Sequence, residues 1–239
     1  MLAMAATNPL SAELRQTPAR ERQDAASARP PRRVRMARPE REGQMLAVAR
    51  ALFAERGFGA VTMDEVAAAA GITKPLLYNY FGNKEQLYLA CMGPAGDALL
   101  EAILTAVRAA ADPAEALEVG IGAFFAFLDS ERGAWRVLFD ETLPASGEVA
   151  LRVAEYRERL AALLEEALGA QLGGSVSGRV ATEVGALSTA VLGAAEALGR
   201  WWLREQSISA AEAAQMLAET LAPGMRARIA ARAGAGGAR

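Results

Sequence analysis

Residues 61–87 carry polar and aromatic side chains of the kinds that bind nucleic acid. Ammonium, hydroxyl, amide and phenol groups are the groups with which proteins contact DNA phosphates and the edges of bases. The stretch supplies all four kinds in close succession, in Thr73, Lys74, Tyr78, Asn79 and Tyr80. This combination predicts an outward-facing surface for a polyanion.

Lys84 adds a second feature to this stretch. A helix is expected to begin after Asn83, which would place Lys84 in its first turn. A cation there opposes the helix dipole unless an anion lies nearby. A DNA phosphate would be such an anion, bound by the helix N-terminus and the ammonium together.

The sequence lacks the residues of the common catalytic and metal sites. It contains no histidine and a single cysteine, Cys91. The lack of histidine removes the usual Ser-His-Asp and Cys-His nucleophiles and most zinc sites. A single cysteine cannot form an internal disulfide. We therefore expect no cofactor and no metal. Two alternatives stay open: an all-α enzyme that uses a buried carboxylate such as Glu141 on a small apolar substrate, and an adaptor that binds proteins through long helices.

Two short helices must position the polar surface. Thr62 and Glu65 have the spacing of a capping box, which predicts a helix beginning at Met63. Gly71 lies where that helix should end and the chain reverse, because glycine takes a left-handed conformation at little cost. Thr73 and Pro75 then suit the start of a second helix, over about residues 74–79. Two short helices joined by a glycine turn form the helix-turn-helix pattern.

The residues around this pattern resemble the DNA-binding domain of TetR-type (TetR/AcrR) transcriptional regulators. The matching residues run from Ala51 to Tyr88 and read ALFAERGFGAVTMDEVAAAAGITKPLLYNYFGNKEQLY, of which LYNYFGNKEQL is the most specific part. With the preceding helix, the resemblance covers about residues 39–88. The rest of the chain matches such regulators in length and helical character, but not in motifs.

The resemblance implies roles for single residues. Those implied to hold phosphates are Thr62, Tyr78, Tyr80 and Lys84. Those implied to lie nearest the bases are Thr73, Lys74, Pro75 and Asn79. Proline at position 75 departs from the glycine that is frequent in such regulators, which could change how closely the backbone approaches DNA.

Composition and charge distribution favour an all-α protein with one basic end. The chain has 239 residues, of which 52% are hydrophobic, and helix formers dominate while β-branched runs are scarce. The net charge is only −2, yet the first 44 residues carry nine arginines against five acidic residues. A basic end on an acidic body suggests that this end meets a polyanion.

We divide the chain into four parts. Residues 1–38 form a flexible basic arm, rich in proline and arginine, whose Arg38 could contact DNA; a solvated, nonspecific tail is the alternative. Residues 39–90 form the DNA-binding domain, with a first helix over about residues 39–56 that stops at Gly57. Residues 91–232 form a helical effector-binding and dimerisation domain, and residues 233–239 form a flexible tail.

The expected helices of the second domain follow an interruption at Gly93, Pro94 and Gly96, where proline should kink or break the fourth helix. They cover residues 97–111, 113–129, 132–141, 146–168, 179–205 and 210–232. The most apolar segment, residues 180–203, carries Glu183, Glu196 and Arg200, so it reads as a buried helix and not as a membrane span. We expect a cytoplasmic protein without membrane contact.

Aromatic residues gather in the middle of the chain. Spacing alone favours hydrophobic core, but the resemblance implies a small-molecule pocket in this region for a hydrophobic or aromatic effector. The candidate pocket residues are Phe124, Phe127, Trp135, Phe139, Glu141 and Tyr156.

The last two helices carry small residues on several faces. Trp201 and Trp202 are adjacent and cannot share one helix face, so at least one should point outside the subunit's own core, which a dimer interface explains. The alternative is that both cover that core. The resemblance implies pairing through these helices, and the candidate interface residues are Ala190, Gly193, Ala197, Trp201, Leu217 and Leu221.

The leading hypothesis is therefore a homodimeric transcriptional regulator. The resemblance implies a repressor that binds an inverted-repeat operator in double-stranded DNA and is released by its effector. Each recognition helix would enter one major groove.

Overall fold

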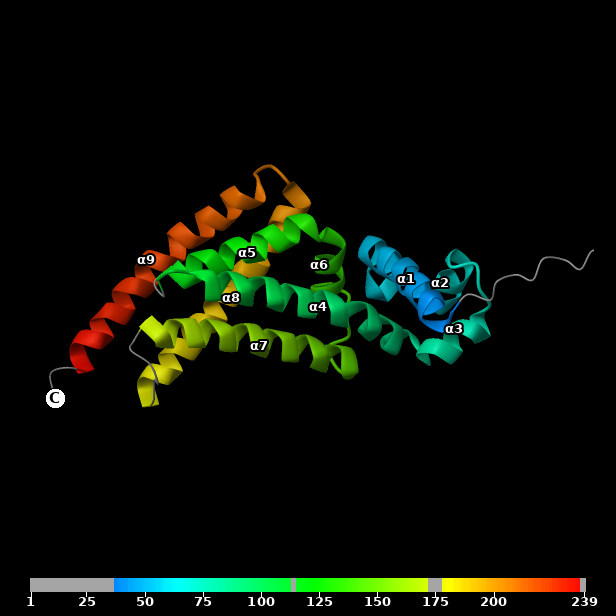
Figure 1. Ribbon diagram of the computed structural model, residues 1–239, viewed down its shortest axis with the longest axis horizontal. Coiled ribbons are helices and arrows are strands. Elements are labelled where there is room, and N and C mark those ends of the chain that lie inside the picture. The colour runs from blue at the N-terminus through cyan, green and yellow to red at the C-terminus, as the bar shows by residue number, and fades with distance from the viewer. Residues whose placement is uncertain (1–36, 113–114, 172–177, 237–239) are drawn as a thin grey trace, which may run out of the picture. The chain divides into compact units, whose positions relative to one another are not determined.

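The computed structural model describes residues 37–112, 115–171 and 178–236. Within these ranges the chain forms helices and no strand, so the predicted all-α class is confirmed (Figure 1). The predicted arm lies outside the described residues except for positions 37 and 38. The helices are α1 (Arg38–Ala60), α2 (Met63–Ala69), α3 (Lys74–Phe81), α4 (Lys84–Ala109), α5 (Ala116–Ser130), α6 (Arg132–Leu138), α7 (Glu148–Gln171), α8 (Gly178–Glu205) and α9 (Ala210–Gly236).

Helices α1 to α3 form a small unit around apolar side chains. Phe53 of α1, Val66 of α2 and Leu77 of α3 are buried together with Leu87 at the start of α4. The starts of α2, α3 and α4 lie where the sequence predicts them, and α3 continues two residues past the expected end. The first helix is predicted to stop at Gly57. Gly57 takes a non-helical φ of 79°, which turns the chain sharply there, and α1 continues to Ala60 after this turn.

Helix α4 corrects one expectation. Of the kink or break expected at Gly93, Pro94 and Gly96, the break is wrong, because α4 runs without interruption from Lys84 to Ala109 with Pro94 inside it, while the kink stays a prediction. Proline removes one backbone bond and costs about 3 kcal/mol in a helix interior. Buried residues on both sides of it, such as Met92 and Leu99, hold the helix in the core and outweigh that cost.

By length and apolar composition alone, α4 could cross a membrane. Half of its most apolar window is buried inside the protein, however. It also packs against five helices of the same chain, α1, α3, α5, α6 and α7. These contacts make α4 a core helix.

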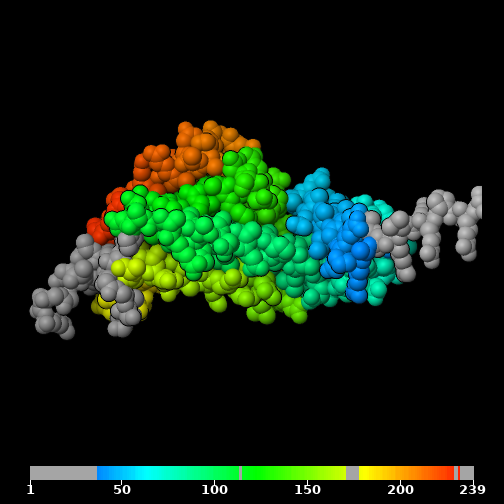
Figure 2. Space-filling model, in the orientation of Figure 1, coloured from blue at the N-terminus to red at the C-terminus, as the bar shows by residue number. Residues whose placement is uncertain are grey.

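The second domain packs around α4 and α5. Helix α5 lies between α4 and α9, and the space-filling view shows α5 and α9 in close contact along one side (Figure 2). Helix α7 lies against α4 and α8, while the short α6 lies against α1 and α4. Helix α6 ends at Leu138, three residues before its expected end, and α9 continues past residue 232 through to Gly236. Residues 172–177, between α7 and α8, fall outside the described residues.

Candidate nucleic-acid interface and effector cavity

Helix α3 has one buried and one exposed face. Leu77 is fully buried and Phe81 is 8% exposed, so these two side chains hold the helix against the domain core. The polar residues lie on the other side, and the exposed ones are Thr73, Lys74, Pro75, Tyr78 and Asn79. The arrangement therefore presents hydroxyl, ammonium, phenol and amide groups on one outer surface, as DNA contact requires.

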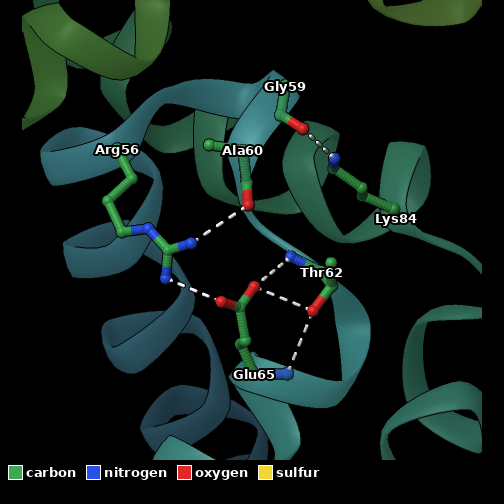
Figure 3. Close-up of polar contacts among 6 residues, drawn as sticks. All are labelled: Arg56, Gly59, Ala60, Thr62, Glu65 and Lys84. Atoms are coloured by element: carbon green, nitrogen blue, oxygen red, sulfur yellow. Dashed lines mark hydrogen bonds and ion pairs between the residues drawn. The ribbon is translucent and has the colours of Figure 1, made fainter.

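A capping box holds the start of α2 in place. The Thr62 hydroxyl accepts from the Glu65 amide at 3.3 Å, and the Glu65 carboxylate accepts from the Thr62 amide at 2.8 Å (Figure 3). Arg56 lies 2.8 Å from the same carboxylate. The Thr62 hydroxyl, the Thr62 amide and then Arg56 lower the pKa of Glu65 to about 2. Thr62, implied to hold a phosphate, is thus exposed and fixed at a helix N-terminus.

The lowered pKa of Glu65 predicts a pH-dependent contribution to stability. Since the folded pKa lies below the ordinary 4.5, the carboxylate stabilises the fold above about pH 4.5, and this contribution is lost as the pH falls towards 2. We expect Glu65→Gln to lower the free energy of unfolding at neutral pH and to have a progressively smaller effect on acidification. Urea unfolding across this pH range measures the difference. Glu55→Gln, at an exposed position on α1, is the control; an effect of Glu65→Gln that stays constant with pH would contradict the prediction.

Lys74 is already paired within the protein. Its ammonium lies 2.7 Å from Asp64 and 5.9 Å from the Tyr78 ring centroid, and the contact with Asp64 raises the pKa of Lys74. Such an exposed pair contributes little to stability, so a phosphate can replace Asp64 at small cost. Thr73 occupies the N-cap position of α3, but its hydroxyl makes no capping bond, which leaves it directed at solvent.

The other residues with predicted DNA roles make contacts within the protein that restrict their side chains. These residues are Lys84, Tyr80 and Arg38. The Arg38 guanidinium is 5.3 Å from the Tyr80 ring centroid. The Lys84 ammonium lies 4.4 Å from the Phe58 ring centroid and donates to the Gly59 carbonyl at 3.5 Å. Partial burial lowers the pKa of Lys84. The DNA roles of all these residues remain predictions.

Two adjacent apolar cavities lie in the second domain. The larger, about 50 Å³, lies between α4, α5, α7 and α8, and its lining includes Ile103, Phe124 and Leu164. The smaller, about 10 Å³, is lined by residues of α4, α6 and α7, among them Tyr156, and by Phe139 directly after α6. Both cavities share Leu160, so they are neighbouring parts of one apolar region.

The structure divides the six candidate pocket residues. Phe124, Phe139 and Tyr156 line the cavities, and Trp135 is buried between Phe124 and Phe139, with ring centroids at 5.2 and 3.7 Å. The other two candidates do not line these two cavities. Phe127 lines a separate surface groove beside α1. Glu141 is exposed, lies 3.9 Å from Arg200 and lines an open surface hollow together with Phe139.

Aliphatic residues of α7 and α8 form much of the lining of the larger cavity, and none of them is among the pocket residues predicted from the sequence. Leu160, Leu163 and Leu164 lie on one face of α7, and Val191 and Ala195 line the cavity from α8. The spacing of the three leucines is the helical i, i+3, i+4 pattern, so a search for apolar stripes would have found them.

Ser188 is a buried polar residue on the same helix. Its side chain is fully buried, and its hydroxyl has no hydrogen-bond partner among the described residues. A buried hydroxyl without a partner costs about 1–3 kcal/mol, so we expect Ser188→Ala to raise the free energy of unfolding by about 1 kcal/mol. Urea unfolding measures this. Thr189→Ala is the control, because that hydroxyl is exposed and already donates to the Gly185 carbonyl at 2.9 Å; a destabilised Ser188→Ala protein would refute the prediction.

Small residues form an exposed stripe along α8. Ala190, Gly193 and Ala197 are exposed at helical spacing, and Trp201 at the end of the stripe is half-buried. Trp202 instead lies in the core, where its indole donates to the Ile208 carbonyl at 2.8 Å. On α9, Leu221 is half-buried.

Leu217 differs from the other candidate interface residues. It is 8% exposed and packs in the core of its own subunit, which leaves it little surface for a partner chain. Pairing itself stays a prediction.

Comparison with known proteins places the chain in a family. Residues 45–91 match the bacterial regulatory proteins of the tetR family, and residues 113–224 match the tetracyclin repressor-like C-terminal domain. A TetR-like transcriptional regulator from Rhodococcus sp. RHA1, known from its crystal structure, is 31% identical, with 79% of this chain and 96% of that chain covered and a TM-score of 0.64. The chain belongs to the TetR family. Its helix-turn-helix domain and its C-terminal domain are thus both of TetR type.

Two further proteins are similar to part of the chain or to its fold. The transcriptional activator FasR from Mycolicibacterium smegmatis is 36% identical over 119 residues, which cover 50% of this chain and 54% of FasR. The chain spans about half the length of the first curated relatives it matches. FadR from Bacillus subtilis, solved in complex with stearoyl-CoA, is 20% identical with a TM-score of 0.64, covers 76% of this chain and 98% of its own, and shares the fold. The matched family and the curated relatives are regulators, so they do not support the enzyme alternative.

Proposed function

We propose that this TetR-family protein is a homodimeric, cytoplasmic repressor that binds an inverted-repeat DNA operator and is released by a small apolar effector. The observation that carries the proposal is the exposed polar face of α3, held outward by the buried side chains of Leu77 and Phe81. A short helix of this kind presents side chains to base edges in the major groove, while residues at neighbouring helix N-termini hold phosphates.

A dimer would deliver this face twice. The exposed stripe of Ala190, Gly193 and Ala197 on α8 lets a second α8 approach closely, because no large side chain separates the two backbones. A two-fold axis between such helices makes the operator an inverted repeat, with half-sites about one helical turn, roughly 34 Å, apart or a multiple of it.

The cavities support an apolar effector. The larger one is lined by aliphatic side chains and Phe124, and none of the described residues in its lining is charged. At about 50 Å³ it is far smaller than the 300–1,000 Å³ of typical ligand sites, so an effector must separate the surrounding helices in order to enter. A ligand that binds only the expanded conformer shifts the population towards it. FadR, solved with stearoyl-CoA, makes acyl compounds a reasonable first set to test.

Selection from a randomised duplex pool with the purified full-length chain tests the proposal. We expect an inverted repeat to be enriched, and Asn79→Ala to change the base preference within each half-site. Native mass spectrometry of the same preparation reports the dimer and any ligand carried through purification. Failure to enrich any duplex, at low as well as physiological salt, would refute DNA binding.

The direction of regulation needs its own assay. FasR is named an activator, so transcription in vitro from a promoter that carries the selected sequence decides between the two directions. We expect less transcript when the protein is added, and recovery when an effector is supplied. More transcript would show activation and overturn the repressor part of the proposal.

A further inference from the structure

The corner between α1 and α2 is held by two side chains from a distant part of the chain. At Gly57 the backbone leaves the helical path, and the amides of Phe58 and Gly59 donate outside α1. The Phe58 amide donates to the Asp140 carboxylate, and the Gly59 amide donates to the Thr142 hydroxyl at 3.0 Å. Asp140 and Thr142, which follow α6, are called the clamp below.

The clamp is a preorganised unit. The Thr142 amide and hydroxyl both donate to Asp140 Oδ1 at 2.8 Å, so each acceptor of the clamp is held by the other. These bonds within the clamp fix both side chains independently of their contacts with the corner.

The corner fits the clamp closely because it is built from glycine. A Cβ atom at Gly57 would lie 3.0 Å from Thr142 Oγ1 and 3.2 Å from both Asp140 carboxylate oxygens. At Gly59 it would lie 3.4 Å from Thr142 Cβ. Glycine at position 57 also permits the φ of 79° that turns the chain towards the clamp.

The opposite side of the same corner holds Lys84. Gly59 donates through its N–H to Thr142 and accepts through its carbonyl from the Lys84 ammonium (Figure 3 shows the second bond). The Phe58 ring, whose amide is bonded to Asp140, lies under the same ammonium at 4.4 Å. Two contacts of Lys84 therefore depend on two residues that the clamp holds.

We propose that Asp140 and Thr142, although they lie outside the helix-turn-helix domain, are positioning residues for DNA binding. They accept hydrogen bonds from the backbone N–H groups of Phe58 and Gly59, and the Phe58 ring and the Gly59 carbonyl in turn fix the Lys84 ammonium at the N-terminus of α4, where a phosphate would bind. The inference rests on the proposed function, because it specifies how the DNA-binding site is kept in order.

A double-mutant cycle tests the clamp. Binding of the full-length chain to the duplex that the wild-type protein selects is measured for Asp140→Ala, Lys84→Ala and the combination. We expect Asp140→Ala to weaken binding roughly tenfold when Lys84 is present and less than about twofold when it is replaced, because the clamp acts through Lys84. A merely destabilising change would weaken binding by the same factor in both backgrounds.

Glu141→Ala is the matched control. It removes the same charge from the neighbouring position, but the Glu141 side chain is 74% exposed and is no part of the clamp. We expect its affinity to stay within about twofold of the wild type, since exposed charges of this kind contribute little. Equal losses for Asp140→Ala and Glu141→Ala would overturn the inference.

A second variant covers the case in which Asp140→Ala does not fold, as judged by circular dichroism. Thr142→Val keeps the shape of the side chain and removes the acceptor for the Gly59 amide. We expect roughly a threefold loss of affinity that again requires Lys84. If Lys84→Ala weakens binding but neither clamp variant does so, the inference fails and the proposed function stands. If the wild-type chain selects no duplex, both fail.

Discussion

Alanine at Gly96 is expected to lower the melting temperature of the protein by roughly 5 °C. A Cβ atom there would lie 2.3 Å from Cζ of Tyr156 and within 2.6 Å of two further ring atoms. The ring cannot move away freely, because its hydroxyl donates to the Gly93 carbonyl at 2.9 Å and the side chain is 7% exposed. Overpacking of this kind costs about 1–3 kcal/mol. Thermal unfolding followed by circular dichroism measures the effect.

Gly93→Ala is the control for this prediction. Gly93 lies one turn earlier in α4, and a Cβ atom there would meet nothing within 4 Å. Alanine should stabilise the helix at this position by up to about 1 kcal/mol, because it restricts the unfolded chain more than glycine does. Equal destabilisation by both substitutions would show that the contact with Tyr156 is not responsible.

Replacement of Lys84 by alanine is expected to weaken DNA binding roughly tenfold on every sequence tested. The ammonium lies at the N-terminus of α4 and would hold a phosphate, so its loss removes affinity without changing base preference. The slope of the logarithm of affinity against that of salt concentration should fall by about one unit, since one fewer counterion is released. Titrations on the selected and on a scrambled duplex, at several salt concentrations, measure both quantities.

Arg108→Ala serves as the control for charge alone. Arg108 is an exposed cation in the last turn of the same helix, at the end opposite Lys84. Its removal changes the net charge equally but should leave the salt slope unchanged. An unchanged slope for Lys84→Ala, or an equal change for Arg108→Ala, would contradict the phosphate role.

The parts of the fold that local chemistry decides were predictable from the sequence. The capping box of Thr62 and Glu65 and the Asn83 cap, whose side chain accepts from the Gln86 amide at 2.8 Å, involve residues three positions apart. Their helices therefore begin where the pattern indicates. The outward face of α3 follows from Leu77 and Phe81 in the same way, because the helical period separates apolar from polar positions.

The parts that depend on distant residues were not predictable in this way. Pro94 would end an isolated helix, and only the burial of α4 among its neighbours keeps it continuous. Phe127 and Glu141 have the right residue types for a pocket, but which way they face depends on how α5 and the segment after α6 pack. The clamp bonds to residues more than 80 positions away in the sequence, and no local spacing pattern predicts contacts between residues so far apart.

The continuity of α4 allows a movement at the cavity to displace the residues at the DNA-binding end of the helix. Ile103, in the wall of the larger cavity, and Lys84 lie on the same unbroken helix, 19 residues apart, which corresponds to about 28 Å. A tilt of roughly 10° about the cavity end would displace Lys84 by about 5 Å. In a symmetric pair the two displacements can add, and a change of about 10 Å is large against a half-site spacing of roughly 34 Å. A helix broken at Pro94 would absorb such a tilt at the break, whereas a continuous one carries it to the DNA.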